Sequence, residues 1–210
     1  MEKAILFDLD GTLTNTLEDI AFAMNRALRL NGLPEHPVDA YRYFVGDGVR
    51  VLVKRVIGEH TGMVEKVYAD YQAWYQEHNL DRTQPYPGVR ELLAGLQRQG
   101  WKMGVFSNKP HADTCRVVKH FFPDVAFTVV RGQMEGVPVK PDPAGALAAA
   151  KDMGVQPEDM LYLGDTDVDM RCAQNAGMHP IGVTWGFRDA EELRAAGAER
   201  LLCHPMDLLL

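Results

Sequence analysis

The sequence predicts an α/β fold in which a parallel-sheet core domain carries an inserted α-helical cap domain. Short apolar runs recur along the chain, and each ends abruptly at polar residues or glycine. Segments with apolar residues at helical spacing alternate with these runs, which indicates strands joined by helices in one parallel sheet. The first run ends at Phe7 and the second begins at Trp101, a much longer gap than the dozen or so residues that a crossover connection needs.

The predicted strands are five short, largely apolar runs. Such runs are typical of parallel strands that helices cover on both faces. They are Ala4–Phe7, Trp101–Phe106, Val125–Val130, Met160–Leu163 and Ile181–Val183.

Amphipathic helices are predicted beside these strands from apolar residues three or four positions apart. One spans Val89 to Leu96 and stops before Gly100, and another spans Ala112 to Phe122 and stops before Pro123. Two more helix starts carry a proline in the first turn or a capping box. They lie at Pro143 and at Asp189 with Glu192.

The long segment between the first two strands is predicted to be helical. Its apolar stripes run over Leu17–Leu28, Val49–Val56 and Val64–Trp74, which is typical of a helix bundle. We therefore expect a cap domain at residues 16–83 and a Rossmann-like core domain formed by residues 1–15 and 84–210. The stretch Gln84–Gly88 is expected to be the return linker. An aromatic stripe has helical spacing and is expected to pack inside the cap: Tyr68, Tyr71, Trp74 and Tyr75.

Composition and charge exclude several classes of protein. The 210-residue chain has a formal net charge of −7 and no clustered Lys and Arg, so nucleic acid is not an expected partner. No apolar stretch approaches the ~20 residues of a membrane span, and the run after Lys3 is too short for a signal peptide, so we expect a cytoplasmic protein. Cys115, Cys172 and Cys203 are far apart, which predicts buried thiols rather than a disulfide frame or a zinc site.

Two carboxylates follow the first strand, in the hexapeptide Phe7-Asp8-Leu9-Asp10-Gly11-Thr12. Residues two apart in an extended segment project to the same side, so Asp8 and Asp10 can face one reacting atom. Two unit charges ~4 Å apart repel by about 4 kcal/mol at an effective dielectric of ~20. A divalent cation or a shared proton is the usual compensation, although a strand followed by an Asp-Gly turn would also give this hexapeptide.

Polar residues follow other strands as well, and in an open parallel sheet such residues meet beyond the carboxyl ends of the strands. They are Ser107-Asn108-Lys109, Lys140-Pro141 and Gly164-Asp165-Thr166-Asp167-Val168-Asp169. Each stretch alone also fits an exposed turn, a helix cap or an acidic helix start. The occurrence of all of them in one chain indicates a single acidic, cationic and hydroxylic site.

These motifs, in this order, resemble those of the haloacid dehalogenase-like hydrolases. The resemblance spans nearly the whole chain, and the helical insertion is similar to the first cap class of that family. Phosphoglycolate phosphatases and their close relatives are the nearest match, through Val45–Gly48, Ser107–Pro110 and Gly177 followed by Gly182–Gly186. The resemblance implies a phosphatase that hydrolyses a small phosphate monoester, similar to 2-phosphoglycolate, through an aspartyl-phosphate intermediate.

The resemblance also implies roles for single residues. Asp8 would be the nucleophile, and Asp10 the general acid and base that protonates the leaving oxygen and then deprotonates water. Ser107 and the backbone around Asn108 would donate hydrogen bonds to phosphoryl oxygens, and Lys140 would neutralise charge that grows during transfer. Expelling an alkoxide needs a proton whereas expelling a halide does not, so Asp10 favours phosphoryl transfer over dehalogenation.

The implied cofactor is Mg²⁺, a hard ion that binds oxygen ligands. Its implied ligands are Asp8, the backbone carbonyl of Asp10 and Asp165. Asp169 would lie just behind them, bound through water or orienting a ligand, and Asp167 is the alternative for that role.

Substrate choice is expected to come from the cap. We predict that the loop from Gly46 to Arg50 closes over the site and that Arg50 binds a substrate carboxylate. A position on a helix face is the alternative for Arg50. Lys109 is a second candidate for contact with the far end of the substrate.

Other functions share parts of this pattern. A β-phosphoglucomutase-like phosphomutase, a pyrophosphatase or a nucleotidase would use the same core, and a phosphoacceptor switch would need only the phosphorylated Asp8. A switch has no reason to carry a helical cap or Asp10. The predicted partner is a small phosphorylated metabolite, with no nucleic acid and no membrane, and the chain is expected to be a monomer or a homodimer.

Overall fold

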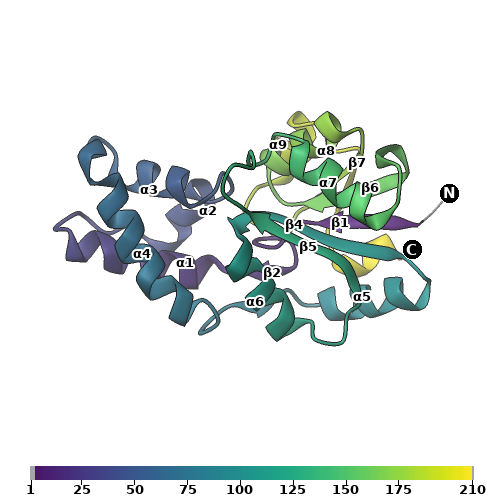
Figure 1. The fold of residues 1–210 in the computed structure, drawn as a ribbon, viewed down its shortest axis with the longest axis horizontal. Helices are drawn as coiled ribbons and strands as arrows, with labels where there is room; N and C mark the ends of the chain where they lie inside the picture. The colour runs from purple at the N-terminus through teal and green to yellow at the C-terminus, as the bar shows by residue number, and fades with distance from the viewer. Residues whose placement is uncertain (1–2, 210) are drawn as a thin grey trace.

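The computed structural model describes residues 3–209 and consists of two lobes (Figure 1). The helical lobe, at the left of Figure 1, comprises residues 17–78. Its elements are α1 (Leu17–Leu30), η1 (Val38–Ala40), α2 (Tyr41–Phe44), α3 (Val49–Ile57), η2 (Thr61–Met63) and α4 (Val64–His78). The remaining described residues form the sheet lobe.

The sheet lobe is built on six parallel strands in the order β5-β4-β1-β6-β7-β8. In chain order they are β1 (Ala4–Phe7), β4 (Lys102–Pro110), β5 (Phe127–Gln133), β6 (Met160–Gly164), β7 (His179–Val183) and β8 (Arg200–Leu202). In the central strands, Phe7 is in register with Val105 on one side and with Leu163 on the other. The residues that follow these three positions therefore meet at one edge of the sheet, and the predicted α/β parallel-sheet fold is confirmed.

Helices cover both faces of this sheet (Figure 1). On one face, α5 (Val89–Arg98) and α6 (His111–Phe121) pack against the strands, and on the other face lie α7 (Ala144–Met153), α8 (Asp167–Ala176) and α9 (Ala190–Ala195). Each face has its own apolar cluster, because the side chains of β1 alternate between the two sides. Ile5 and Phe7 belong to the cluster under α5 and α6, whereas Ala4 and Leu6 belong to the other.

The helical lobe has a third apolar cluster of its own, formed by buried residues of α1 to α4. Met24, Tyr41, Val53 and Tyr71 are among its most buried members. The sheet lobe contributes one buried residue to it, Phe187. Burial of an apolar face against other helices is the main source of helix stability in proteins, so these helices support one another rather than the sheet.

The chain crosses between the lobes twice, and the two crossings are paired. Strand β2 (Thr14–Asn15) on the way out forms a short antiparallel ladder with β3 (Gln84–Pro85) on the way back. The carboxylate of Asp19, in the first turn of α1, accepts hydrogen bonds from the backbone N–H groups of Arg82 and Thr83 at 2.9–3.1 Å. The start of α1 and the return linker are thereby fixed to each other.

The structure differs from the sequence predictions at several elements. Strands β2, β3 and β8 were not predicted because each has only two or three residues. Strand β4 continues to Pro110, after a register shift against β5, so Ser107 and Lys109 lie inside a strand rather than after its end. The prediction of buried thiols is correct for Cys172 but wrong for Cys203, which is exposed after the end of β8, whereas Cys115 is partly buried. No helix within residues 3–209 is long and apolar enough to cross a membrane.

Candidate active site

Asp8 stands at the end of β1, with its side chain buried between the sheet and the loops that follow the other strands. Its Oδ1 accepts a hydrogen bond of 2.8 Å from the Nζ of Lys140, while its backbone N–H bonds to the carbonyl of Leu163 in the neighbouring strand. Burial raises the pKa of Asp8 to about 7, and the nearby Lys140 ammonium opposes that shift.

Lys140 joins Asp8 to a second carboxylate. Its Nζ lies 2.7 Å from Asp169 Oδ1 and 2.8 Å from Asp8 Oδ1, and the side chain is 2% exposed. Burial lowers the pKa of Lys140, but the negative charges of Asp169 and Asp8 leave it well above its ordinary value. The ammonium is therefore fully charged between two buried acids.

Asp169 is oriented by the helix that it begins. Thr166 caps α8, and the two residues form a reciprocal capping box in which Asp169 Oδ2 accepts from the N–H and the hydroxyl of Thr166 at 3.1 and 2.7 Å. Since that oxygen is used by the cap, the other oxygen points to Lys140. The same helix sends Asp167 outward, where it pairs with Arg171, so Asp169 is the residue that turns into the site.

Asp165 follows β6 and is completely buried. Its Oδ1 accepts from the Thr12 hydroxyl at 3.1 Å, and its Oδ2 accepts from the Phe187 N–H at 2.8 Å. Burial, followed by the charges of Asp169 and Asp8, raises the pKa of Asp165 well above its ordinary value in spite of these hydrogen bonds.

Three buried carboxylates thus converge with one positive side chain among them. One oxygen each from Asp8, Asp165 and Asp169 lies within 4.8 Å of the others. Buried anions this close are costly unless a proton or a cation compensates them. Carboxylate oxygens are the ligands that hard divalent cations take, so this donor set fits a magnesium ion and could hold a metal.

The neighbouring residues of β4 have separate tasks. Ser107 is buried and lines the cavity beside Asp8. The side-chain amide of Asn108 donates to the carbonyls of Gly46 and Lys140 at 2.9 and 3.2 Å, and its Oδ1 accepts from the Lys140 N–H at 2.8 Å. Asn108 therefore ties the loop of Lys140 and a loop of the helical lobe to β4 with its side chain.

Lys109 reaches across the cavity to Asp10. Its Nζ lies 3.0 Å from both carboxylate oxygens of Asp10 and 2.6 Å from the hydroxyl of Tyr75, which belongs to α4. Burial lowers the pKa of Lys109, but Asp10 and other nearby groups leave it above its ordinary value. One ammonium group thus links the sheet lobe to the helical lobe.

The cavity between the lobes is small and mixed in character. Its polar wall comes from the sheet lobe, through Asp8, Asp10, Ser107, Lys109 and Lys140. Its apolar wall comes mainly from the helical lobe, through Ile20, Val45, Val49, Leu52, Tyr71 and Tyr75. The cavity volume is about 40 Å³, so little space is left between the lobes.

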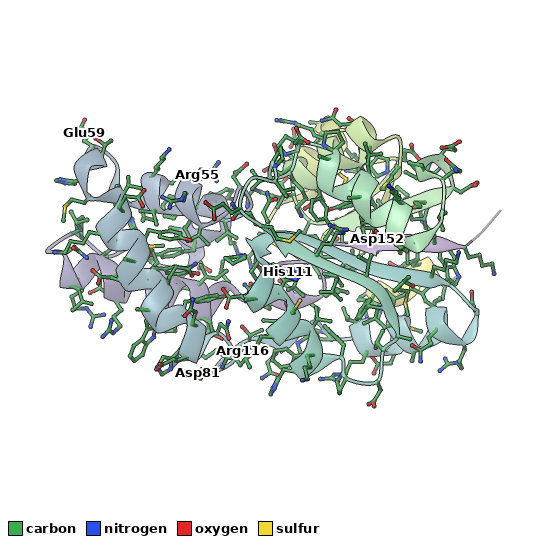
Figure 2. All side chains as sticks on the ribbon, in the orientation of Figure 1. Arg55, Glu59, Asp81, His111, Arg116 and Asp152 are labelled. Carbon is green, nitrogen blue, oxygen red and sulfur yellow. The ribbon has the colours of Figure 1, made fainter. Side chains whose placement is uncertain are left out.

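Several contacts hold the lobes together around this cavity. Arg188 of the sheet lobe donates to the carbonyls of Val45, at 3.0 Å, and Arg42. Arg116 of α6, labelled in Figure 2, donates through its Nη1 to the carbonyl of Gln76 in α4. The lobes are therefore closed on each other in this structure, and Gly46 lies over the polar wall; a loop from Gly46 to Arg50 that closes over the site stays a prediction.

Arg50 is not brought to the site. Its side chain is 54% exposed, pairs with Glu65 and lies over the ring of Tyr68 at 4.5 Å. It is absent from the cavity wall, because α3 turns the side chain of Arg50 toward α4 and solvent. The helix-face alternative describes its position.

Four residues at or beside the cavity were missed as functional candidates: Tyr71, Tyr75, Phe187 and Arg188. Tyr71 and Tyr75 are buried in the helical lobe, as predicted, but they also line the cavity and stack on each other with ring centroids 5.0 Å apart. Their spacing in the sequence predicts burial on one helix face and gives no sign of what lies opposite that face. Phe187 and Arg188 follow no motif that would have identified them.

Comparisons with known proteins agree with this geometry. A family model described as "Haloacid dehalogenase-like hydrolase" matches residues 5–183. The phosphoglycolate phosphatase of Pseudomonas putida is 32% identical over 93% of this chain and 74% of its own length. That of Aquifex aeolicus is 30% identical over 99% of this chain and 95% of its own. A crystal structure from Lactobacillus delbrueckii subsp. bulgaricus has a TM-score of 0.93 at 30% identity, covering 99% of this chain and 97% of that one.

Proposed function

Because the chain belongs to the haloacid dehalogenase-like hydrolases, we propose that it is a Mg²⁺-dependent phosphatase of small phosphate monoesters that resemble 2-phosphoglycolate. The observation that carries the proposal is the convergence of buried Asp8, Asp165 and Asp169 around Lys140 at the end of the central strands. The names of the relatives support 2-phosphoglycolate as the substrate to test first.

The residues of the site suit a two-step hydrolysis. An Asp8 carboxylate oxygen attacks phosphorus, the bond to the ester oxygen breaks, and that oxygen leaves with a proton from Asp10. Asp10 then takes a proton from the water that attacks phosphorus, which releases inorganic phosphate and restores the Asp8 carboxylate. The position of Asp10 two residues after Asp8, at the same cavity, supports this division of roles.

The other residues hold charge and geometry. The Lys140 ammonium lies against Asp8 and is placed to neutralise charge on the phosphoryl group during transfer. Ser107 lines the same wall and is placed to donate to a phosphoryl oxygen. Asp8, Asp165 and Asp169 would hold the magnesium ion, which offsets the negative charge of the phosphate ester when bound.

The helical lobe is the proposed cap domain. Its separate apolar cluster and the paired crossings at β2 and β3 support a unit that moves about two linkers. The small cavity favours a substrate with few atoms beyond the phosphate. The closed structure therefore does not support the alternative that the protein is a hexose phosphate mutase.

The deciding experiment is metal-dependent phosphate release from 2-phosphoglycolate, sugar phosphates, nucleoside monophosphates and pyrophosphate. We expect the fastest release from 2-phosphoglycolate, a need for Mg²⁺, and a loss of at least ~1000-fold in Asp8→Asn, which has no nucleophilic carboxylate. An exposed Asp124→Asn change serves as the matched control. Release that persists in Asp8→Asn would sink the proposed mechanism.

A further inference from the structure

Lys109 uses all of its hydrogen-bonding capacity inside the closed cavity. An ammonium group has three N–H donors. Here Lys109 donates to the two carboxylate oxygens of Asp10 and to the Tyr75 hydroxyl. The Lys109 side chain is 3% exposed, and Tyr75 is 1% exposed. These contacts are therefore buried and well defined, unlike a surface ion pair.

The same contacts occupy Asp10. Both of its carboxylate oxygens face the Lys109 ammonium at 3.0 Å. An oxygen that is to exchange a proton with the leaving group needs to point at that group from hydrogen-bond distance. Each Asp10 oxygen keeps a second lone pair for that group, but the two contacts fix the orientation of the carboxylate, which turns more freely when Lys109 gives up one of them.

Lys109 is also the cation that a second anionic group would meet. Among the described residues of the cavity wall, the basic side chains are Lys109 and Lys140. Lys140 is held between Asp8 and Asp169. Val49, Leu52 and Tyr71 also line the cavity and carry no positive charge, so among the lining side chains Lys109 is the cation that remains for a second anion.

We propose that Lys109 determines specificity for phosphate monoesters that carry a carboxylate close to the ester oxygen. In the loaded site the Lys109 ammonium transfers a hydrogen bond from Asp10 to the substrate carboxylate, which frees Asp10 to face the leaving oxygen. Tyr75 holds the ammonium in place during this exchange. The inference rests on the proposed phosphatase function and names the substrate feature that this site selects.

The geometry favours a carboxylate over a larger anion. Little space is left inside the cavity, and a carboxylate is the smallest common anionic group of metabolites. A substrate with a neutral group at that position leaves Lys109 on Asp10 and is hydrolysed slowly. The selection therefore acts on turnover as well as on binding.

The test compares two substrates of the same shape. One is 2-phosphoglycolate, and the other is 2-phosphoglycolamide, in which a neutral amide replaces the carboxylate. Phosphate release is measured with Mg²⁺ for the wild-type protein, Lys109→Met and Tyr75→Phe. Lys119→Met is the matched control, because Lys119 lies exposed on α6, away from the cavity.

We expect the wild-type protein and Lys119→Met to prefer 2-phosphoglycolate. In Lys109→Met the ratio of the two kcat/KM values should fall by roughly 10- to 100-fold, the effect of one hydrogen bond to a charged group. In Tyr75→Phe the ratio should fall less, by roughly 2- to 10-fold, because Lys109 keeps its charge and loses only the hydroxyl that positions it. Tyr75→Phe keeps the ring, so it decides the matter if Lys109→Met does not fold.

Two results would overturn the inference and leave the proposed function intact. One is equal hydrolysis of the two substrates by the wild-type protein, and the other is a Lys109→Met variant in which both substrates lose activity to the same extent. If the wild-type protein hydrolyses neither substrate but releases phosphate from other esters, the proposed substrate is wrong and the inference fails with it.

Discussion

Gly11 allows Asp165 to approach the turn that follows Asp10. It has a φ of +91°, and a Cβ added there would overlap the carboxylate of Asp165. Gly154 also has a positive φ, +65°, but a Cβ there would meet open space. The two glycines therefore share the backbone requirement and differ in the clash.

This pair of glycines gives a residue-scale prediction. Gly154→Ala should lower the free energy of unfolding by about 1–2 kcal/mol, the cost of a left-handed backbone for a residue with a Cβ. Gly11→Ala should cost more, because Asp165 must move, and should lower kcat/KM at least ~100-fold, since small displacements at a reacting centre are expensive. Urea denaturation and phosphate release measure both. A Gly11→Ala variant no worse than Gly154→Ala would refute the argument.

Lys140 gives a second residue-scale prediction. Lys140→Met removes the cation between buried Asp8 and Asp169, so we expect a loss of roughly 100- to 1000-fold in kcat, typical of one lost charge-stabilising group. Removing one partner of a buried pair also destabilises proteins by about 3–5 kcal/mol. Lys151→Met, at an exposed position on α7, should change neither quantity. Full activity of Lys140→Met would show that another group neutralises the phosphoryl charge.

At this scale the sequence predicts the acids better than their partners. Asp8, Asp165 and Asp169 follow strand ends, and the rule that parallel strands end at one edge brings them together. The contact of Lys109 with Tyr75 was not predictable, because Tyr75 comes from another lobe and pairing across lobes leaves no local pattern. For Arg50 the prediction failed in the opposite way. Its residue type suits binding to a carboxylate of the substrate, but α3 directs its side chain to Glu65 and solvent.

At the scale of elements, the connection between the lobes depends on Asp19. This buried carboxylate at the start of α1 accepts from the N–H groups of Arg82 and Thr83 and from the Thr83 hydroxyl. Each of these donors would lose its partner if the carboxylate were removed, and buried unpaired donors are costly. The β2–β3 ladder contributes only two residue pairs to this connection, so the contacts of Asp19 are a large part of it.

Asp19→Ala should therefore destabilise the protein by roughly 2–4 kcal/mol and loosen the linker. Amide hydrogen exchange should accelerate at residues 82–85 more than in β1. Asp39→Ala, an exposed acid of the helical lobe, should have an effect within ~0.5 kcal/mol. Unchanged exchange at the linker in Asp19→Ala would mean that the β2–β3 ladder holds the crossing without help.

Elements with many residues in a periodic pattern were predictable from the sequence. Strand β1 was predicted with the bounds that it has, and α5 and α6 differ only at their ends. Strands β2 and β3 were not, because two residues cannot show a period and their pairing depends on the insertion between them. An acidic helix start was considered for this stretch, but the specific capping box of Thr166 and Asp169 was not predicted.

At the scale of the whole molecule, the acidic cluster should make the stability of the folded protein depend on pH and on metal. The pKa of Asp8 rises to about 7 on folding, against about 3.9 for an unperturbed aspartate. The folded protein therefore holds a proton on Asp8 between these pH values that the unfolded chain does not. This contribution to stability is complete below pH ~4 and is lost as the pH rises through about 7.

Magnesium binding should reverse that loss, because a metal ion takes the place of the proton. At pH 7.5, with Mg²⁺ at about 100 times its dissociation constant, stability should increase by about 2.7 kcal/mol, or roughly 5–10 °C in Tm for a chain of this size. At pH 5.5 the proton on Asp8 weakens the apparent affinity for Mg²⁺ by roughly 30-fold, so the same Mg²⁺ concentration should shift Tm by only about 2 °C.

Thermal unfolding with and without Mg²⁺ measures both shifts. Asp124→Asn should behave as the wild-type protein does, whereas Asp8→Asn, which lacks one of the proposed ligands of the ion, should show a much smaller Mg²⁺ shift at pH 7.5. Equal shifts at the two pH values would show that the ion does not compete with a proton on Asp8.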